Sequence, residues 1–213
     1  MREDVPTMRW TAVIPVKRLA AAKTRLQVAG MDAADRRALA LALAVDTVGA
    51  VCGCAAVRRV MVVTDDVEAA MTLEPLGVTV VGDEPDAGLN PALAHGATQA
   101  ARLAPGDGVA VLSADLPALR AAELAGALRV ASAHPRAFLP DAAGTGTTLL
   151  TARPGVPLDP RYGPDSRAAH RDSGAVELPG RWPSLRRDVD TPGDLAEAAR
   201  LGLGSATRGL VRR

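Results

Sequence analysis

Aromatic residues are scarce in this chain of 213 residues, which contains two Trp, one Tyr and one Phe. Proteins that bind single-stranded nucleic acid stack bases on aromatic side chains, and nucleic-acid binders in general carry a basic stripe. The formal net charge here is only +1. We therefore expect no nucleic-acid partner, and a core built from Ala, Val and Leu.

Cysteines and long apolar runs are also scarce. Cys52 and Cys54 are the only cysteines; without nearby histidines they cannot complete a tetrahedral zinc site, and their C-x-C spacing suits a disulfide poorly. We interpret both as small buried side chains in a reducing environment. Because we find no signal peptide and no run long enough to span a membrane, we expect a cytoplasmic protein with no membrane partner.

Two common nucleotide-binding fingerprints are missing. The chain has no G-x-x-x-x-G-K-[ST], and no G-x-G-x-x-G follows its first apolar run, which excludes a P-loop and a dinucleotide fingerprint. The histidines His95, His134 and His170 have no matched acid or nucleophile nearby in the sequence. We therefore interpret them as structural or surface residues and expect no nucleophilic triad.

Short Val-rich runs alternate with longer Ala/Leu-rich segments of helical periodicity. This pattern predicts strands at 10–15, 60–63, 78–81 and 109–112, each followed by a helix, at 33–50, 67–76, 91–103 and 120–132. Later elements are strands at 136–139, 147–151, 175–178 and 185–189, a short helix near 167–171 and a helix after Thr191. The order βαβαβαβα plus extra strands predicts a doubly wound, mostly parallel α/β sheet with late β insertions. We expect one domain over residues 1–213, with 1–8 as a disordered lead-in.

Polar residues and prolines mark where several helices begin. Asp32 is predicted to cap the first helix, and Thr191 the last, with Pro192 at its first position. Asn90 is predicted to cap the third helix, with Pro91 at its first position.

Only two of the 25 basic residues are lysines, Lys17 and Lys23, and the other 23 are arginines. Both lysines and Arg25 follow the first predicted strand, which ends at Pro15. In so arginine-rich a chain, a lysine beside a strand end is a candidate for a role that needs a compact ammonium group. Open α/β sheets bind ligands at the carboxyl ends of their strands, so we predict an anion site here. A solvated basic loop is the alternative.

Three aspartates follow or flank predicted strand ends. Asp115 comes shortly after the strand at 109–112, while Asp188 and Asp190 flank Val189, so that both carboxylates share one face of an extended backbone. Turn or surface roles are the alternatives for these residues taken singly. Together, opposite a basic loop, they predict a magnesium site, because Mg²⁺ prefers oxygen ligands and shares them with substrate phosphates.

Five short motifs together resemble one protein family. They are Val13-Ile-Pro-Val-Lys17, Ala22-Lys23-Thr-Arg25-Leu26, Gly88-Leu-Asn90-Pro-Ala-Leu, Ser113-Ala-Asp115-Leu-Pro117 and Asp188-Val-Asp190-Thr-Pro. Over about Thr11 to Leu201 the chain resembles the phosphoenolpyruvate/2-phospho-L-lactate guanylyltransferases of deazaflavin coenzyme F-420 biosynthesis. That family is similar to the GT-A-like nucleotidyltransferases. The chain departs from the wider superfamily in lacking a glycine-rich G-x-G-x-R loop, whose place residues 15–25 take.

The resemblance implies an activity and a set of site residues. GTP and phosphoenolpyruvate would give enolpyruvoyl-2-diphospho-5'-guanosine and pyrophosphate, with Mg²⁺ held by Asp115, Asp188 and Asp190. The acceptor acid would bind Thr148, Gly163 and Ser166. We expect catalysis to depend on Lys17, Lys23, Arg25 and Asp115. Nucleotide binding is expected to involve Pro15, Lys17, Lys23, Asp83 and Asn90, with guanine read between Gly82 and Asn90, where Asp83 and Glu84 follow the third strand.

Three alternatives remain open from the sequence. The acceptor could be 2-phospho-L-lactate, which differs little in size from phosphoenolpyruvate. The chain could be another nucleotidyltransferase, for example one like the molybdenum-cofactor guanylyltransferases, or a non-enzymatic nucleotide sensor. With Thr148, Gly163 and Ser166 as the acceptor site, the proline-rich segment between Arg153 and Pro164 is predicted to fold over the acceptor.

Overall fold

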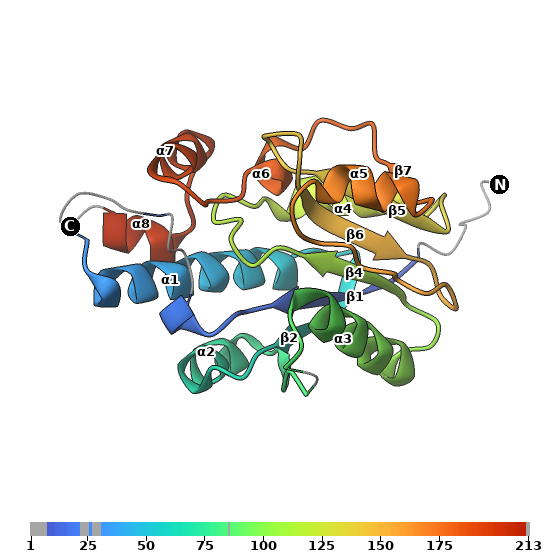
Figure 1. Cartoon of the computed structure of the whole chain (residues 1–213), viewed down its shortest axis with the longest axis horizontal. Helices are drawn as coiled ribbons and strands as arrows, with labels where there is room; N and C mark the ends of the chain where they lie inside the picture. Colours follow the sequence, from blue (N-terminus) through green and yellow to red (C-terminus); the bar gives the residue numbers. More distant parts are fainter. Residues whose placement is uncertain (1–7, 22–25, 27–30, 85, 212–213) are drawn as a thin grey trace.

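The computed structural model of the chain describes residues 8–21, 26, 31–84 and 86–211. The strands are β1 (Trp10–Pro15), β2 (Val57–Val63), β3 (Thr79–Val81), β4 (Gly108–Leu112), β5 (Arg136–Pro140), β6 (Thr147–Ala152) and β7 (Val176–Glu177). They form a seven-stranded sheet in the order β3-β2-β1-β4-β6-β5-β7 (Figure 1). Of these strands only β6 is antiparallel to its neighbours β4 and β5. The predicted mostly parallel sheet with late β insertions is therefore confirmed.

Helices cover both faces of the sheet. They are α1 (Ala33–Cys52), α2 (Val67–Leu73), α3 (Leu89–Leu103), α4 (Ala121–Ala131), α5 (Ser166–Asp172), α6 (Pro183–Arg186), α7 (Pro192–Leu201) and α8 (Ser205–Val211), with short 3-10 turns η1 (Leu19–Ala21) and η2 (Glu74–Leu76). Buried residues of α1, α2 and α4 form one core layer with the sheet. Those of α3 form the other layer, on the opposite face. This two-sided cover makes the sheet doubly wound.

The first strand shows why the sheet is buried on both sides. Ala12 and Ile14 belong to the core layer of α1, whereas Val13 belongs to the layer of α3, and all three are fully buried. A parallel strand between two helical layers is apolar on both faces, so its sequence shows a continuous apolar run. Burial of each such Val or Ile side chain contributes about 1.5–3 kcal/mol to folding.

Two predicted helix starts have the expected caps. Asp32 accepts a hydrogen bond from the backbone N–H of Asp35 (2.8 Å) and thereby caps α1. Thr191 and Asp194 cap α7 reciprocally, with Pro192 at the first position. Each cap satisfies N–H groups that have no partner inside the helix, and a cap of this kind is worth about 1 kcal/mol.

Two predicted elements are wrong. The N-cap of α3 is Gly88, and Asn90 lies inside the first turn, where its amide is engaged by another segment. Residues 185–189 do not form a strand, because Pro183 starts the helical turn α6 and Arg187 to Val189 have no strand partner in the described sheet. The helix α8 was not predicted.

The proline-rich segment after β6 also lies elsewhere than predicted. Because β6 is antiparallel to β4, its last residue Ala152 pairs with Val109 near the amino end of β4. Residues 153–160 consequently line a cavity against α3 at that end of the sheet. They lie away from the carboxyl ends of the parallel strands, and the chain returns to that edge only after Pro160.

The remaining sequence expectations have mixed outcomes. Met8 packs against the core, contrary to a disordered lead-in over 1–8, while residues 1–7 lie outside the described residues. Cys54 is buried as expected, but Cys52 is exposed. Within the described part of the chain, no helix has the length and apolar character needed to cross a membrane.

Candidate active site

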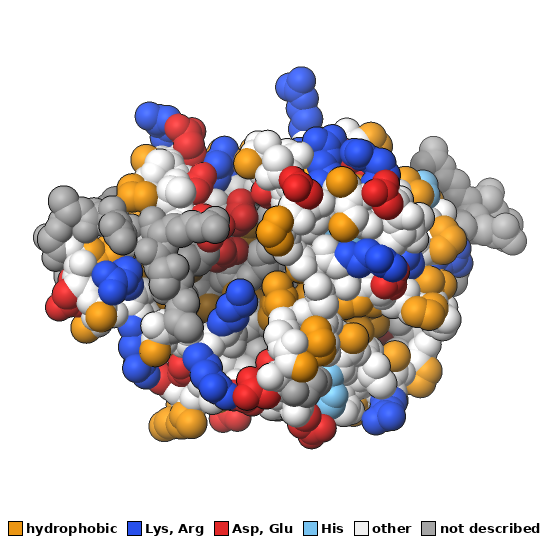
Figure 2. All heavy atoms as spheres, in the orientation of Figure 1, with side chains coloured by type: hydrophobic (Ala, Val, Ile, Leu, Met, Phe, Trp, Pro, Cys, Tyr) orange, Lys and Arg blue, Asp and Glu red, His pale blue; other side chains and the backbone are white. Residues whose placement is uncertain are grey.

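The carboxyl ends of β1, β2, β3 and β4 meet at one edge of the sheet, and β6 begins there because it runs the opposite way (Figure 1). The Ser113 N–H, just after β4, donates to the carbonyl of Thr148 in β6 (3.0 Å). Figure 2 shows a hollow on this side of the molecule, with acidic side chains gathered at its rim below α7. Most of the predicted site residues follow strands at this edge.

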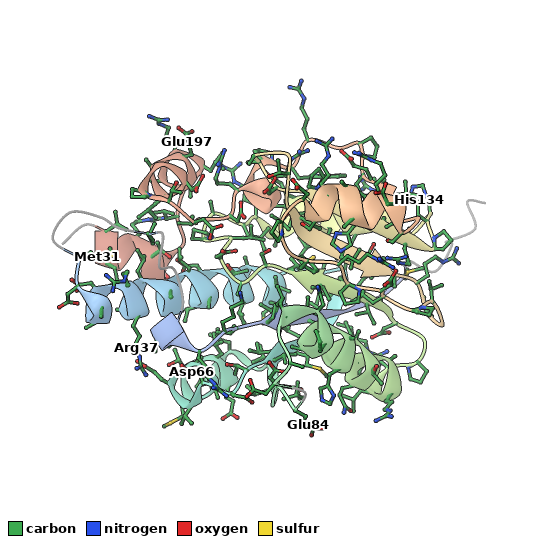
Figure 3. All side chains as sticks on the ribbon, in the orientation of Figure 1. Met31, Arg37, Asp66, Glu84, His134 and Glu197 are labelled. Atoms are coloured by element: carbon green, nitrogen blue, oxygen red, sulfur yellow. The ribbon has the colours of Figure 1, made fainter. Side chains whose placement is uncertain are left out.

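The loop after β1 is anchored where the sequence predicted an anion site. Leu19 donates its N–H to the Asp66 carboxylate (2.8 Å), which also accepts from the N–H of Ala69 and so caps α2. Burial acts to raise the pKa of Asp66, but these N–H groups and Arg37 outweigh it and lower the pKa. Figure 3 shows Arg37 of α1 close to the start of α2, where Asp66 lies. The beginning of the loop is thus fixed by a charged carboxylate.

Only part of the predicted basic group after β1 lies among the residues that the structure describes. Lys17 is exposed two residues after the end of β1 at Pro15, as predicted. Lys23 and Arg25 lie outside the described residues. Sequence reasoning did not single out Arg18, whose guanidinium is 3.7 Å from Asp65.

Four acidic residues form what we call the carboxylate cluster, namely Asp115, Asp141, Asp188 and Asp190. The backbone N–H of Val189 donates to the carbonyl of Asp115 (3.1 Å), which joins the segment before α7 to the end of β4. Burial raises the pKa of Asp188 to about 7, and the charges of Asp115, Asp141 and Asp190 add to this effect. The predicted trio therefore does come together, although on irregular backbone and not on a strand.

The spacing of the carboxylates differs from the expected metal site. Among the described residues, Asp65, Asp83 and Asp86 are the group of three that each offer one carboxylate oxygen within 4.8 Å of the other two. Asp115, Asp188 and Asp190 are spaced more widely. Their donor set of carboxylate oxygens still suits Mg²⁺, and a dication would offset the repulsion that acts on Asp188.

The three predicted acceptor-binding residues lie close to one another. Ser166 donates its N–H to the carbonyl of Gly163 (3.2 Å) and its hydroxyl to Thr147 Oγ1 (3.3 Å), next to Thr148. The Thr148 side chain is fully buried, and its hydroxyl has no hydrogen-bond partner among the described residues. Gly163 is exposed with φ +143°, a backbone conformation that favours glycine. A buried hydroxyl without a partner is costly, so a bound ligand group is its natural complement.

The residues predicted to bind the nucleotide have different surroundings. Asp83, just after β3, donates its N–H to Asp65 (2.8 Å), and one of its own buried carboxylate oxygens has no partner among the described residues. Glu84, labelled in Figure 3, lies 3.9 Å from His95 of α3. Asn90 instead forms hydrogen bonds with the backbone of Tyr162 through both polar groups of its side chain.

Sequence reasoning missed two buried polar residues at this edge. Asp141 accepts hydrogen bonds from the backbone N–H groups of Gly144 (2.6 Å), Thr145 (3.0 Å) and Gly146 (2.9 Å). A side chain at Gly146 would collide with Asp141, because an added Cβ would lie 2.4 Å from its carboxylate oxygen. The aspartate before two closely spaced glycines was the available signal for this turn. The other missed residue is Thr147, which binds His170.

Comparison with known proteins identifies the family. The family described as "Guanylyl transferase CofC like" matches residues 10–174. The chain belongs to this family. The matched range includes Lys17, Asp115 and the residues predicted to bind the acceptor, and ends before Asp188 and Asp190.

Individual similar proteins match nearly the whole length of the chain. A "Phosphoenolpyruvate guanylyltransferase" of Salinispora arenicola is 59% identical over 204 residues, covering 94% of this chain and 92% of its own length. A protein of the same name from Streptomyces coelicolor is 56% identical over 210 residues and covers 97% of both chains.

Solved structures of more distant proteins share the fold. A putative nucleotide-diphospho-sugar transferase from Desulfovibrio desulfuricans has a TM-score of 0.69 at 19% identity, covering 96% of this chain and 94% of its own. A 4-diphosphocytidyl-2C-methyl-D-erythritol synthase has a TM-score of 0.60 at 14% identity, covering 91% of this chain and 99% of its own. The predicted GT-A-like nucleotidyltransferase fold is thereby confirmed, and the family is one of guanylyl transferases.

Proposed function

We propose that this protein transfers the guanylyl group of GTP to the phosphate of phosphoenolpyruvate, in deazaflavin coenzyme F-420 biosynthesis. The products are enolpyruvoyl-2-diphospho-5'-guanosine and pyrophosphate. The observation that carries the proposal is the identity of 59%, over 94% of this chain, with a protein named phosphoenolpyruvate guanylyltransferase. The site is consistent with it, because the carboxylate cluster and the buried hydroxyl groups of Thr148 and Ser166 lie at the same sheet edge.

The reaction needs no general base from the protein. An oxygen of the acceptor's phosphate forms a bond to the α-phosphorus of GTP, and the bond from that phosphorus to the oxygen of the leaving pyrophosphate breaks. A phosphate monoester has a second pKa of about 6, so near neutral pH it is largely dianionic and already nucleophilic. Catalysis therefore consists mainly of positioning two anions and neutralising their charge.

The protein's own residues supply that positioning. Lys17, with Lys23 and Arg25, would bind the triphosphate next to Pro15, and Asp83 would accept from guanine. Thr148 and Ser166 would donate their hydroxyls to the acid, with the Gly163 N–H beside them. Asp115, Asp188 and Asp190 would hold Mg²⁺, which when bound offsets the negative charge of the substrate phosphates.

Product analysis tests this proposal. Purified protein with Mg²⁺ and GTP is incubated with phosphoenolpyruvate, with 2-phospho-L-lactate or with no acceptor, and the products are identified by mass spectrometry. We expect pyrophosphate and the guanosine diphosphate adduct of enolpyruvate. If only 2-phospho-L-lactate gave an adduct, that acid would be the acceptor instead of phosphoenolpyruvate. Absence of pyrophosphate release with either acid would reject the proposal and leave another acceptor or a nucleotide sensor.

We also predict that the protein selects guanine over adenine. Guanine offers the N1 and N2 donors to an acceptor such as Asp83, whose buried oxygen lacks a partner among the described residues. A site built for such bonds rejects a base that lacks them, and we expect kcat/KM for ATP to be at least about 100-fold lower than for GTP. Equal values of kcat/KM for ATP and GTP would contradict this prediction.

A further inference from the structure

Residues 161–166, which we call the acceptor segment, follow the cavity-lining residues 153–160, carry Gly163 and Ser166, and end at the first residue of α5. Two side chains from helices, Asn90 and His170, bind the backbone of its first two residues. Neither has been given a role in binding the acceptor. The inference drawn from them rests on the proposed function, because it takes Gly163 and Ser166 as contacts of the phosphorylated acid.

Asn90 holds Tyr162 through a pair of hydrogen bonds. Its Nδ2 donates to the carbonyl of Tyr162 (2.9 Å), and its Oδ1 accepts from the Tyr162 N–H (2.7 Å), across 72 residues of sequence. Only an amide offers a donor and an acceptor in this arrangement. Because Asn90 lies in the first turn of α3, whose buried face packs on the sheet, it connects the residue before Gly163 to a rigid element.

His170 holds Arg161 and Thr147 at the same time. Its Nε2 accepts from the backbone N–H of Arg161 (2.9 Å), so this nitrogen carries no proton. The proton of the neutral ring is then on Nδ1, which donates to Thr147 Oγ1 (2.9 Å). The ring is fully buried, with Phe138 and Tyr162 at centroid distances of 5.8 and 5.1 Å. Burial, with nearby Arg136 contributing, lowers the pKa of His170 to about 4, which keeps this neutral form at neutral pH.

The hydrogen bonds continue from His170 to Ser166. Thr147 Oγ1 accepts a hydrogen bond from His170 Nδ1, so the hydroxyl proton of Thr147 remains available for another partner. In this structure Ser166 donates its hydroxyl to Thr147 Oγ1 (3.3 Å), but because Thr147 still has a proton of its own, the direction of this bond can reverse. When Thr147 donates to Ser166, the Ser166 hydroxyl proton is released to point at an anion. The chain of groups from His170 thus orients the hydroxyl that the acceptor needs.

We propose that Asn90 and His170 are positioning residues for the phosphorylated acid, fixing the acceptor segment and the donor direction of Ser166 without touching the substrate. This assigns Asn90 to the acceptor side of the site, whereas its motif had suggested nucleotide binding. The two readings give opposite kinetic results. A positioning role raises the KM of the acceptor, and direct nucleotide contact raises the KM of GTP.

The variant Asn90→Asp separates these readings, because it keeps the size and the acceptor oxygen but loses the donor and faces the Tyr162 carbonyl with a charge. We expect a rise in the phosphoenolpyruvate KM of about tenfold, with the GTP KM changed less than about twofold. Gln99→Glu makes the same amide-to-acid change on α3 and serves as control. A rise in the GTP KM alone, or no rise in either KM, would overturn the role of Asn90.

Hydrogen exchange measured by mass spectrometry gives a readout that does not depend on activity. Without substrates, Asn90→Asp should speed exchange of the amides at 161–163, and Gln99→Glu should leave them as in the wild type. If exchange in Asn90→Asp were unchanged, Asn90 would not be holding the acceptor segment in place. If the wild type releases no pyrophosphate with any acid, the proposed function fails, whereas this exchange result still decides whether the segment is held as inferred.

A double-mutant cycle tests the connection from His170 to Ser166. His170→Gln can place its amide oxygen where Nε2 accepts from the Arg161 N–H, but it has no group at the position of Nδ1 to donate to Thr147. Thr147→Val removes the same hydroxyl if the histidine variant does not fold. Either change should raise the acceptor KM about fivefold alone, and less than about twofold in a Ser166→Ala background. His134→Gln, away from this segment, is the control. Equal effects in both backgrounds would show that His170 and Thr147 support the fold only.

Discussion

Asp188 is the member of the carboxylate cluster whose pKa is raised, because burial and the charges of three neighbouring carboxylates all disfavour its ionised form. We predict that Asp188→Asn lowers turnover at least about 100-fold, because a lost metal ligand costs several kcal/mol of transition-state stabilisation. Steady-state pyrophosphate release over a range of Mg²⁺ concentrations measures this.

The same substitution should leave the fold intact, because it removes a like charge and keeps the side-chain shape. Thermal unfolding in metal-free buffer at pH 8 should therefore show the variant to be at least as stable as the wild type. Asp190→Asn should behave similarly in turnover. Near-normal Mg²⁺-dependent rates in both variants would exclude them as the metal site.

His170 should make the protein sensitive to mild acid. Its pKa is lowered to about 4 in the folded state by burial and by Arg136, with Asp159 opposing, whereas the unfolded chain has the ordinary value of 6.5. Between these values the unfolded state binds the proton and the folded state does not, so stability is lost as the pH falls. At pH 5 the loss due to His170 is about 2 kcal/mol relative to pH 7.

Urea unfolding of the wild type and His170→Gln at pH 7 and pH 5 measures this contribution. The glutamine has no ionising group, so the difference in unfolding free energy between the two pH values should be smaller in the variant by about 2 kcal/mol. An equal pH difference in both proteins would mean that His170 titrates alike in the folded and unfolded states.

The sequence predicted individual residues where chemistry alone is diagnostic. Asp115, Asp188 and Asp190 could be grouped because oxygen ligands opposite a basic loop suit Mg²⁺, although the strand predicted beside Asp188 and Asp190 is irregular backbone. Thr147 and His170 could not, since their value lies in hydrogen bonds between residues 23 apart that only the packed fold defines. From the sequence alone, an exposed histidine cannot be distinguished from a buried histidine that forms hydrogen bonds to distant residues.

At the scale of elements, agreement follows the length and burial of each segment. The bounds of β1 were predicted to the residue because a doubly buried strand is a continuous apolar run between polar residues. The strand predicted at residues 185–189 was wrong because two apolar residues in a short polar segment fit a strand and a helical turn equally well. There the proline at 183 decided the outcome in favour of α6.

The acceptor segment carries a prediction of its own. Ser166→Ala should raise the phosphoenolpyruvate KM about tenfold with little change for GTP, because it removes one hydrogen bond to an anion, worth about 1.5–3 kcal/mol. Lys23→Ala should do the reverse. Gly163→Val should be more damaging than Ser166→Ala, since a β-branched residue at φ +143° is strained whatever the space around it.

Measured KM values for both substrates in these three variants test the division of the site. Gly163→Val also needs a thermal unfolding curve, so that a loss of fold is not taken for a loss of binding. If Ser166→Ala and Gly163→Val weakened GTP binding alone, the acceptor would have to bind elsewhere.

At the scale of the whole molecule, the residues predicted to bind the two substrates lie on different parts of one sheet. The residues predicted to bind GTP follow β1 and β3, and those predicted to bind the acid belong to β6 and the acceptor segment, with β4 between β1 and β6. Hydrogen bonds connect the end of β4 to β6, between Ser113 and Thr148, and α3 to the acceptor segment, between Asn90 and Tyr162. Alignment of the two substrates for transfer therefore requires that both parts belong to the same cooperative unit.

The two tryptophans allow a test of that expectation for residues 1–213. Trp10 is buried in β1, and Trp182, just before α6, packs beside Gly126 of α4 against the same core layer. In Trp182→Phe and Trp10→Phe variants, fluorescence reports one region each, while far-UV circular dichroism reports the whole molecule. We predict that fluorescence and circular dichroism give the same urea midpoint within each variant, as a two-state domain requires. Separate midpoints in either variant would divide the chain into two units, in which case the hydrogen bonds of Ser113 and Asn90 would be contacts between domains and would not belong to a single core.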